Sequence, residues 1–445
     1  MAISRVRATS RRSLWLVLST VLSGVAVAQN EEVSYSIPGK TARVGTRTVQ
    51  VGPTRIIARE ARTPQVASWS DGTMVMTAGN PVVSTNIRSS DQGQRWMPQT
   101  QYFGYVNSLE VQTGNLLIVN FDLEIINTTT GSYKVDRWIS QDKGMSLLGP
   151  ITNGRVTLPP AQFDTGFPHW INEFIQMPNG DMFAAVQSLS PNATSFNDPW
   201  DTALIESVDG GIIWSFKSMV ANQSTISDPG GKLTANNWPL YYATEPTLLH
   251  TGGNNLVCVM RSTNDEMNNM PLTQISAPSS TYHDLGSTIS GDGIFSGIMS
   301  LPANQYYQPG PPNAPLIIAH SSDRGATWTA ATPMARARGV FPRLAKDGNG
   351  IVALCYGGLS GVPRWGHAIV FSFDGGLSWT REVQFGPFLT TGYTDIVAVG
   401  PGHFVVFYDV TPPQPWTNHE HWWTGAVDIE VFDMVQVPPA EKTAR

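Results

Sequence analysis

Hydrophobic positions along the chain fall into short apolar stretches that come in pairs around a turn rich in Gly or Asn. Two apolar runs joined in this way are typical of a β-hairpin. The last apolar stretch, Ala426 to Val431, is expected to close a ring with the first blade of the fold. The paired pattern occurs six times, at residues 62–77, 105–122, 169–187, 245–261, 340–357 and 393–409.

The composition agrees with a chain made of strands and turns. Charged residues make up 14% of the 445 residues, against about 25% in an ordinary soluble domain. The chain also holds 41 Gly, 32 Pro and 14 Trp. This composition argues against a coiled coil, a helical bundle and disorder, and it favours a large all-β protein with many short strands.

A second repeat, Ser-x-Asp-x-Gly-x-x-Trp, marks turns of one kind. Asp accepts hydrogen bonds from nearby backbone N–H groups, Gly supplies a positive φ, and Trp packs beneath the turn, so the repeat has a structural role. Four full copies begin at Ser89, Ser207, Ser321 and Ser372, and a degenerate copy begins at Ser140. Together with the six hairpins, these turns predict a six-bladed β-propeller over residues 45–435.

The chain ends lie outside this predicted propeller. Residues 1–28 have the pattern of a secretory signal peptide, with an arginine-rich start, the apolar run Leu14 to Leu22 and the cleavage site Ala26-Val27-Ala28. An N-terminal membrane anchor is the alternative. Residues 29–44 are an extension and 436–445 a tail. We therefore expect a secreted protein, or a periplasmic one in a bacterium, without a membrane span.

The charge balance and the cysteines limit the possible partners. Removing the four arginines of the signal peptide from 28 basic residues leaves 24, against 34 acidic ones, which disfavours nucleic acid as a partner. We expect a monomer. Cys258 and Cys355 lie in apolar runs and are expected to be buried free thiols, with one disulfide as the alternative.

In a propeller, the residues that open the inner strands meet at one mouth of the central channel. Three of the predicted hairpins open with chemically reactive side chains, namely Arg62, Glu245 and Tyr393. Residues far apart in the sequence are therefore expected to share one pocket.

The octapeptide turns and the hairpins together resemble the sialidase (neuraminidase) superfamily. The resemblance includes Ala61-Arg62-Thr63-Pro64, Glu245-Pro246-Thr247, Gly392-Tyr393-Thr394-Asp395 and Tyr408-Asp409. It implies an exo-glycosidase that releases a terminal acidic sugar, with sialic acid the expected one. Octapeptide turns alone identify the type of propeller and not its activity.

The resemblance also implies a role for each site residue. Tyr393 would be the nucleophile and Glu245 its base, while Asp409 would orient Arg62. Guanidinium groups suit the substrate carboxylate because they bind it through two parallel hydrogen bonds. The three arginines expected to do so are Arg62, Arg261 and Arg364, with Arg338 and Arg343 as rivals for the third place.

The general acid of this family has no counterpart at the expected place. The segment 78–88, after the first hairpin, contains neither Asp nor Glu. An acid would have to come from another loop, and the candidates are Asp122, Glu124, His169 and Asp284.

This gap keeps two other functions open. One is a lyase or hydrolase acting on a polysaccharide that contains uronic acid, with His169 or His283 as the base. The other is a propeller that binds glycans without cleaving them. No cofactor is expected, although Ca²⁺ is left open, and His419-Glu420-His421 is either part of a metal site or a solvated loop.

Overall fold

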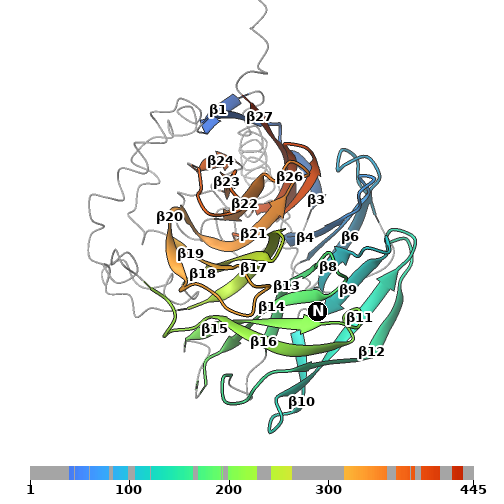
Figure 1. Ribbon diagram of the computed structural model, residues 1–445. Coiled ribbons are helices and arrows are strands. Elements are labelled where there is room, and N and C mark those ends of the chain that lie inside the picture. Colours follow the sequence, from blue (N-terminus) through green and yellow to red (C-terminus); the bar gives the residue numbers. More distant parts are fainter. Residues whose placement is uncertain are drawn as a thin grey trace, which may run out of the picture.

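The computed structural model describes about three fifths of the chain. The described residues are 40–44, 46–59, 61–79, 84–98, 106–120, 122–163, 169–191, 193, 199–227, 242–262, 315–357, 367–380, 382–385, 392–410 and 423–433. The predicted signal peptide and the tail 436–445 lie outside them. All regular elements of this part are strands, β1 to β27 (Figure 1), which confirms the all-β class. No helix among the described residues is long and apolar enough to cross a membrane.

Three sheets are antiparallel and have four strands, each paired with the next along the chain. The first contains β4 (Arg62–Ser68), β5 (Met74–Gly79), β6 (Ser84–Ser89) and β7 (Met97–Pro98). The second contains β17 (Thr244–Gly252), β18 (Asn255–Arg261), β19 (Pro315–Ser321) and β20 (Thr332–Arg338). The third contains β21 (Val340–Lys346), β22 (Val352–Gly357), β23 (His367–Ser372) and β24 (Val383–Phe385).

A nine-stranded sheet contains two further runs of four strands, joined by a parallel pairing of their last strands, β12 and β16. The first run is β8 (Val106–Glu110), β9 (Leu116–Asn120), β11 (Ser132–Ser140) and β12 (Leu148–Thr157). The second run is β13 (His169–Gln176), β14 (Met182–Leu189), β15 (Trp200–Ser207) and β16 (Ile213–Ala221). The ninth strand, β10 (Asp122–Asn127), pairs with β11 and β13.

The remaining sheet joins the two ends of the described chain. Its C-terminal strands are β25 (Thr394–Gly400), β26 (His403–Val410) and β27 (Trp423–Asp433), and its N-terminal strands are β1 (Lys40–Val44), β2 (Arg47–Val51) and β3 (Arg55–Arg59). Both β2 and β3 pair with β27. Figure 1 shows the blue N-terminal strands beside the red C-terminal ones. The last strand thus pairs with the segment that precedes the first hairpin rather than with that hairpin.

All six predicted hairpins are present, as the pairs β4–β5, β8–β9, β13–β14, β17–β18, β21–β22 and β25–β26. The first strands of these hairpins also contact one another in a closed cycle, in the order β4, β8, β13, β17, β21, β25 and back to β4. Residues that open these strands are therefore brought to a common centre.

The octapeptide turns have the hydrogen bonds that their residue types predict. In each of the five copies, the Ser hydroxyl accepts the backbone N–H of the Gly, as Ser140 does from Gly144 at 2.7 Å. The Asp carboxylate accepts N–H groups of the following residues, and every one of these glycines has a positive φ. The sequence did not reveal that the residue before the Gly also has a positive φ, including Gln92, Lys143 and Arg324.

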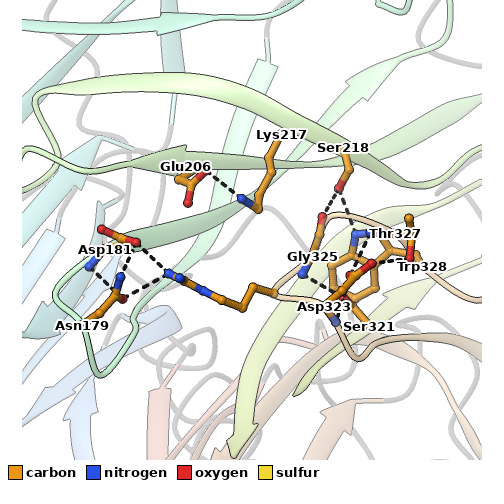
Figure 2. Close-up of polar contacts among 11 residues, drawn as sticks. Asn179, Asp181, Glu206, Lys217, Ser218, Ser321, Asp323, Gly325, Thr327 and Trp328 are labelled. Atoms are coloured by element: carbon orange, nitrogen blue, oxygen red, sulfur yellow. Dashed lines mark hydrogen bonds and ion pairs between the residues drawn. The ribbon is translucent and has the colours of Figure 1, made fainter. Parts of the chain in front are cut away.

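These turns also fasten one sheet to the preceding one. A Cβ added to Gly144 would meet Val75 of the preceding sheet at 2.6 Å, so only Gly allows this approach. Arg324 reaches the β13–β14 turn, where it donates to Asp181 at 2.6 Å and to Asn179 at 3.1 Å. Figure 2 shows this contact together with Ser218, which accepts the indole N–H of Trp328.

The two cysteines are free and buried, on β18 and β22. The expectation of buried thiols is confirmed, and the alternative of a disulfide between Cys258 and Cys355 is wrong.

Candidate active site

The first strands of the six hairpins, β4, β8, β13, β17, β21 and β25, are called the inner strands here. Three of them begin with the same irregular backbone. Thr63, Glu245 and Phe341 have φ values of 52°, 47° and 48°, and each is the second residue of its strand. Each is followed by a proline, and the pairing register shifts at each of these positions. A bulge of this kind bends the strand and redirects its side chains, and bulges often lie next to active sites.

Glu245, on β17, is held by contacts from three other strands. Its Oε1 accepts a hydrogen bond from Arg261 Nη1 at 2.9 Å, and its Oε2 accepts one from the backbone N–H of Phe341 at 2.8 Å. Its own N–H donates to the side-chain oxygen of Gln187 on β14. The Arg261 side chain is 4% exposed and that of Glu245 is 16% exposed, so the pair lies at the border between core and solvent.

Phe341 contacts three of the residues that the sequence singled out, namely Tyr393, Arg343 and Glu245. The ring centroids of Phe341 and Tyr393 are 4.7 Å apart, and Arg343 Cζ lies 4.3 Å from the Phe341 centroid. Because the Phe341 N–H also binds Glu245, the structure brings Tyr393, Glu245, Arg261 and Arg343 together. Arg343 had been predicted only as a rival for the third arginine.

Glu173 on β13 adds a second carboxyl group next to these residues. Its Oε2 accepts hydrogen bonds from the Thr247 hydroxyl and from the Leu248 N–H, the latter at 3.2 Å, and lies 3.8 Å from Arg343 Nη1. Burial raises the pKa of Glu173 to about 7, with Arg343 acting in the opposite direction. A quarter of the side chain is nevertheless exposed, so solvent can reach it.

Asp395 on β25 is a third acidic group near Arg343. Its carboxylate accepts the N–H of Val66 on β4 at 2.5 Å. Burial raises the pKa of Asp395 to about 6, again opposed by Arg343, and its negative charge contributes to the raised pKa of Glu173. Three inner strands thus place one arginine and two carboxyl groups close enough to influence each other's protonation.

The structure describes the other residues of the predicted site only in part. Asp409 is completely buried, and its N–H donates to the Tyr393 carbonyl at 3.3 Å. It lies opposite Thr424, whose hydroxyl donates to the carbonyl of Ala61, the residue before Arg62. Arg62 opens β4, but its side chain lies outside the described part, as does that of Arg338. Arg364 lies wholly outside the described residues, so the three-arginine grouping stays a prediction.

Two of the substitute acids lie in unsuitable surroundings. Glu124 forms an exposed ion pair with Lys134 at 3.0 Å. His169 is fully buried and bonded to the Tyr133 hydroxyl at 2.7 Å, and burial lowers its pKa to about 4. Because His169 has no access to solvent, it is poorly placed both as the acid and as the base of a lyase.

The other candidates lie beyond what is described: the side chain of Asp122, and His283, Asp284 and His419-Glu420-His421. In the described ranges, no group of three or more His, Cys, Asp or Glu side chains is arranged to hold a metal ion.

Glu173 and Phe341 are the site residues that sequence reasoning missed. Glu173 carried a signal, since it is a carboxyl group in a strand between the apolar residues Ile171 and Phe174. Phe341 carried none beyond the proline that follows it, because its role comes from its backbone N–H and its position.

No family model matches the chain, and no curated protein matches it. Among solved structures, it is similar to a protein of unknown function from Dyadobacter fermentans, with 15% identity over 86% of this chain and 99% of that one and a TM-score of 0.55. It is also similar to the Hadza microbial sialidase Hz136, with 15% identity over 84% of this chain and 66% of that one and a TM-score of 0.50. At such identities the likeness shows the fold alone, and the chain therefore has the propeller-type fold found in glycoside hydrolases.

Proposed function

We propose that this chain is a glycoside hydrolase in which Glu173 is the general acid and Glu245 is the second catalytic carboxylate. The observation that carries the proposal is the pair itself: two carboxyl groups, from neighbouring inner strands, in different surroundings. Two carboxyl groups with separate roles are the usual equipment of a glycosidase.

Glu173 has the properties of an acid. With a pKa of about 7, it is largely protonated in mildly acidic solution. Its Oε2 is occupied as an acceptor by Thr247 and Leu248, whereas its Oε1 makes no hydrogen bond with any described residue. The proton therefore belongs on Oε1, from which it can pass to the oxygen of a leaving group.

Glu245 has the properties of a positioned carboxylate. Arg261 and the Phe341 N–H fix both of its oxygens, and the Gln187 side chain binds its backbone. In this role it attacks the anomeric carbon, activates a water molecule, or takes the proton of a neighbouring nucleophile.

The second candidate function is the narrower one, a sialidase-type exo-glycosidase acting on a terminal acidic sugar. Its support is the contact between Tyr393 and Phe341, which places the tyrosine beside the residue that binds Glu245. Tyr393 would attack, Glu245 would accept its proton, and Arg62, Arg261 and Arg364 would bind the carboxylate, with Asp409 orienting Arg62. In either case Glu173 supplies the acid that the segment 78–88 lacks.

The six-bladed arrangement belongs to the same proposal. The cycle of six first strands supports it, as do the five groups of four consecutive or nearly consecutive strands. The sixth blade would be β25, β26 and β27 with the N-terminal strands β2 and β3. The predicted signal peptide would deliver a monomeric enzyme to carbohydrate outside the cell or in the periplasm.

The experiment is a set of fluorogenic aryl glycosides, one sialoside and several neutral sugars, given to the wild-type protein and to two variants, Glu245→Gln and Tyr393→Phe. We expect Glu245→Gln to lose at least 10³-fold in kcat on whichever sugar is cleaved. Loss on Tyr393→Phe with a sialoside as the substrate supports the sialidase-type mechanism. Cleavage of a neutral sugar that survives Tyr393→Phe supports the mechanism with two carboxyl groups. No cleavage of any glycoside, or cleavage unchanged in Glu245→Gln, would overturn the proposal and favour a glycan-binding propeller.

A further inference from the structure

Glu245 adopts a backbone conformation that its own sequence does not favour. Its φ of 47° lies in the left-handed region, which residues other than Gly, Asn and Asp avoid. The following Pro246 restricts it further, since a residue before proline prefers extended conformations. Neighbouring groups must therefore hold this backbone in place.

The group that binds the Glu245 backbone is the side chain of Gln187. Gln187 lies on β14, the second strand of the preceding hairpin, and its side chain is buried. Its Oε1 accepts hydrogen bonds from the Glu245 N–H and from the Thr244 hydroxyl, the latter at 2.8 Å. One side-chain oxygen thus fixes two successive residues at the bulge of the next hairpin.

Further hydrogen bonds connect Glu245 to Thr394, the residue that follows Tyr393. The Glu245 carboxylate accepts the N–H of Phe341, the second residue with a positive φ, and the Phe341 carbonyl accepts the Thr394 hydroxyl at 3.1 Å. Gln187, Glu245, Phe341 and Thr394 therefore form a chain of hydrogen bonds across β14, β17, β21 and β25. Only Gln187 in this chain holds the bulge from outside the inner strands.

We propose that Gln187 is a positioning residue, which aims the Glu245 carboxylate at the substrate by fixing the bulge at Thr244 and Glu245. This inference rests on the proposed function for its kinetic effect, although its structural effect is independent of it. Displacing a catalytic group by about 1 Å can cost about 10²-fold in rate, so the expected loss is large for a residue that does not contact the substrate.

The test compares Gln187→Met with Gln176→Met. Methionine has a similar length but offers no strong acceptor. Gln176 is the matched control because it lies at the far end of the same hairpin and its Oε1 accepts the N–H of Gln112, which follows β8 of the neighbouring hairpin, at 2.7 Å. Each variant loses two hydrogen bonds. Those of Gln187 lie at the site, whereas those of Gln176, with the Gln112 N–H and the Gly180 carbonyl, lie away from it. Gln187→Glu, which retains an acceptor oxygen, is the conservative variant.

Two measurements are made on all three variants: a crystal structure, and kcat and KM on the glycoside that the wild type cleaves. We expect Gln187→Met to move the Glu245 carboxylate by about 1 Å or more and to lower kcat about 10²-fold with little change in KM. Gln187→Glu restores most of kcat, and Gln176→Met leaves both the carboxylate and kcat unchanged.

The outcomes separate this inference from the proposed function. If Glu245→Gln is inactive while Gln187→Met behaves like Gln176→Met, the inference is wrong and the function stands. If no glycoside is cleaved, the crystal structures still decide: an unmoved Glu245 in Gln187→Met overturns the positioning role, and a displaced one supports it.

Discussion

At the scale of single residues, the proposed function depends on the environment of Glu173. A carboxyl group between apolar residues was visible in the sequence, but its raised pKa was not. That pKa comes from burial among strands far apart in the chain, and the charge of Asp395 adds to it while Arg343 opposes it. For the same reason, the sequence did not indicate that Arg261, predicted as a ligand for a substrate carboxylate, also donates a hydrogen bond to Glu245. The sequence identified the reactive residue types at the openings of strands, but not their partners.

The raised pKa of Glu173 predicts the pH dependence of activity. A general acid works only when protonated, so kcat/KM is expected to be high in mildly acidic solution and to fall about tenfold per unit above pH 7. Replacing Asp395 by Asn removes a negative charge that raises this pKa, and the fall then moves to lower pH. The check is a pH–rate profile of wild type and Asp395→Asn. A profile that is identical in both would argue against Glu173 as the acid.

At the scale of elements, the hairpins and turns followed from the sequence, whereas the bulges did not. Alternating apolar runs and Gly turns depend on neighbouring residues, which is why all six hairpins were found. The bulges at Thr63, Glu245 and Phe341 depend on groups in adjacent sheets, such as the Gln187 oxygen and the Glu245 carboxylate. The proline after each was the one local sign of them.

The octapeptide turns offer a comparison between two glycines. Gly144 has a φ of 80° and no room for a Cβ beside Val75, whereas Gly210 has a φ of 76° with nothing within 4 Å. We expect Gly210→Ala to lower the free energy of unfolding by about 1 kcal/mol, from backbone strain alone. Gly144→Ala adds overlap with a stiff, buried valine and should cost about 3 kcal/mol. Urea unfolding measures both, and equal losses would contradict the close approach.

At the scale of the whole molecule, the first and last strands hold the fold together. The sequence predicted that Ala426 to Val431 would close the ring, but pairing over more than 370 residues left no local pattern, and the partners proved to be β2 and β3. Asp428 on β27 strengthens this closure, because it binds Arg55 of β3 and His403 of β26. Burial opposes the charged form, but hydrogen bonds from His403 and Arg55 lower the pKa of Asp428 to about 2.

Two aspartates on β27 test this closure. Asp428 is 16% exposed in its pair with Arg55, whereas Asp433 is 57% exposed in its pair with Arg47. We expect Asp428→Asn to lower the free energy of unfolding by about 2 kcal/mol and Asp433→Asn to change it by less than about 0.5 kcal/mol. Because the pKa of Asp428 is lowered on folding, its contribution is present above pH 4 and disappears as the pH falls through about 2. Urea unfolding at pH 7 and at pH 2 checks both statements, and a loss that persists at pH 2 would contradict the role of the charge.

The central claim is that Glu173 and Glu245 share one active site as acid and carboxylate. Its most direct measurement is kcat/KM of Glu173→Ala on two glycosides of the cleaved sugar, one with an activated aryl leaving group and one with an alkyl leaving group. The aryl group needs little help from an acid, so we expect a small loss on the aryl glycoside and a loss of about 10²-fold or more on the alkyl one. An equal loss on both substrates would contradict a role for Glu173 as the acid, because Glu173 would then act on the fold and not on the leaving group.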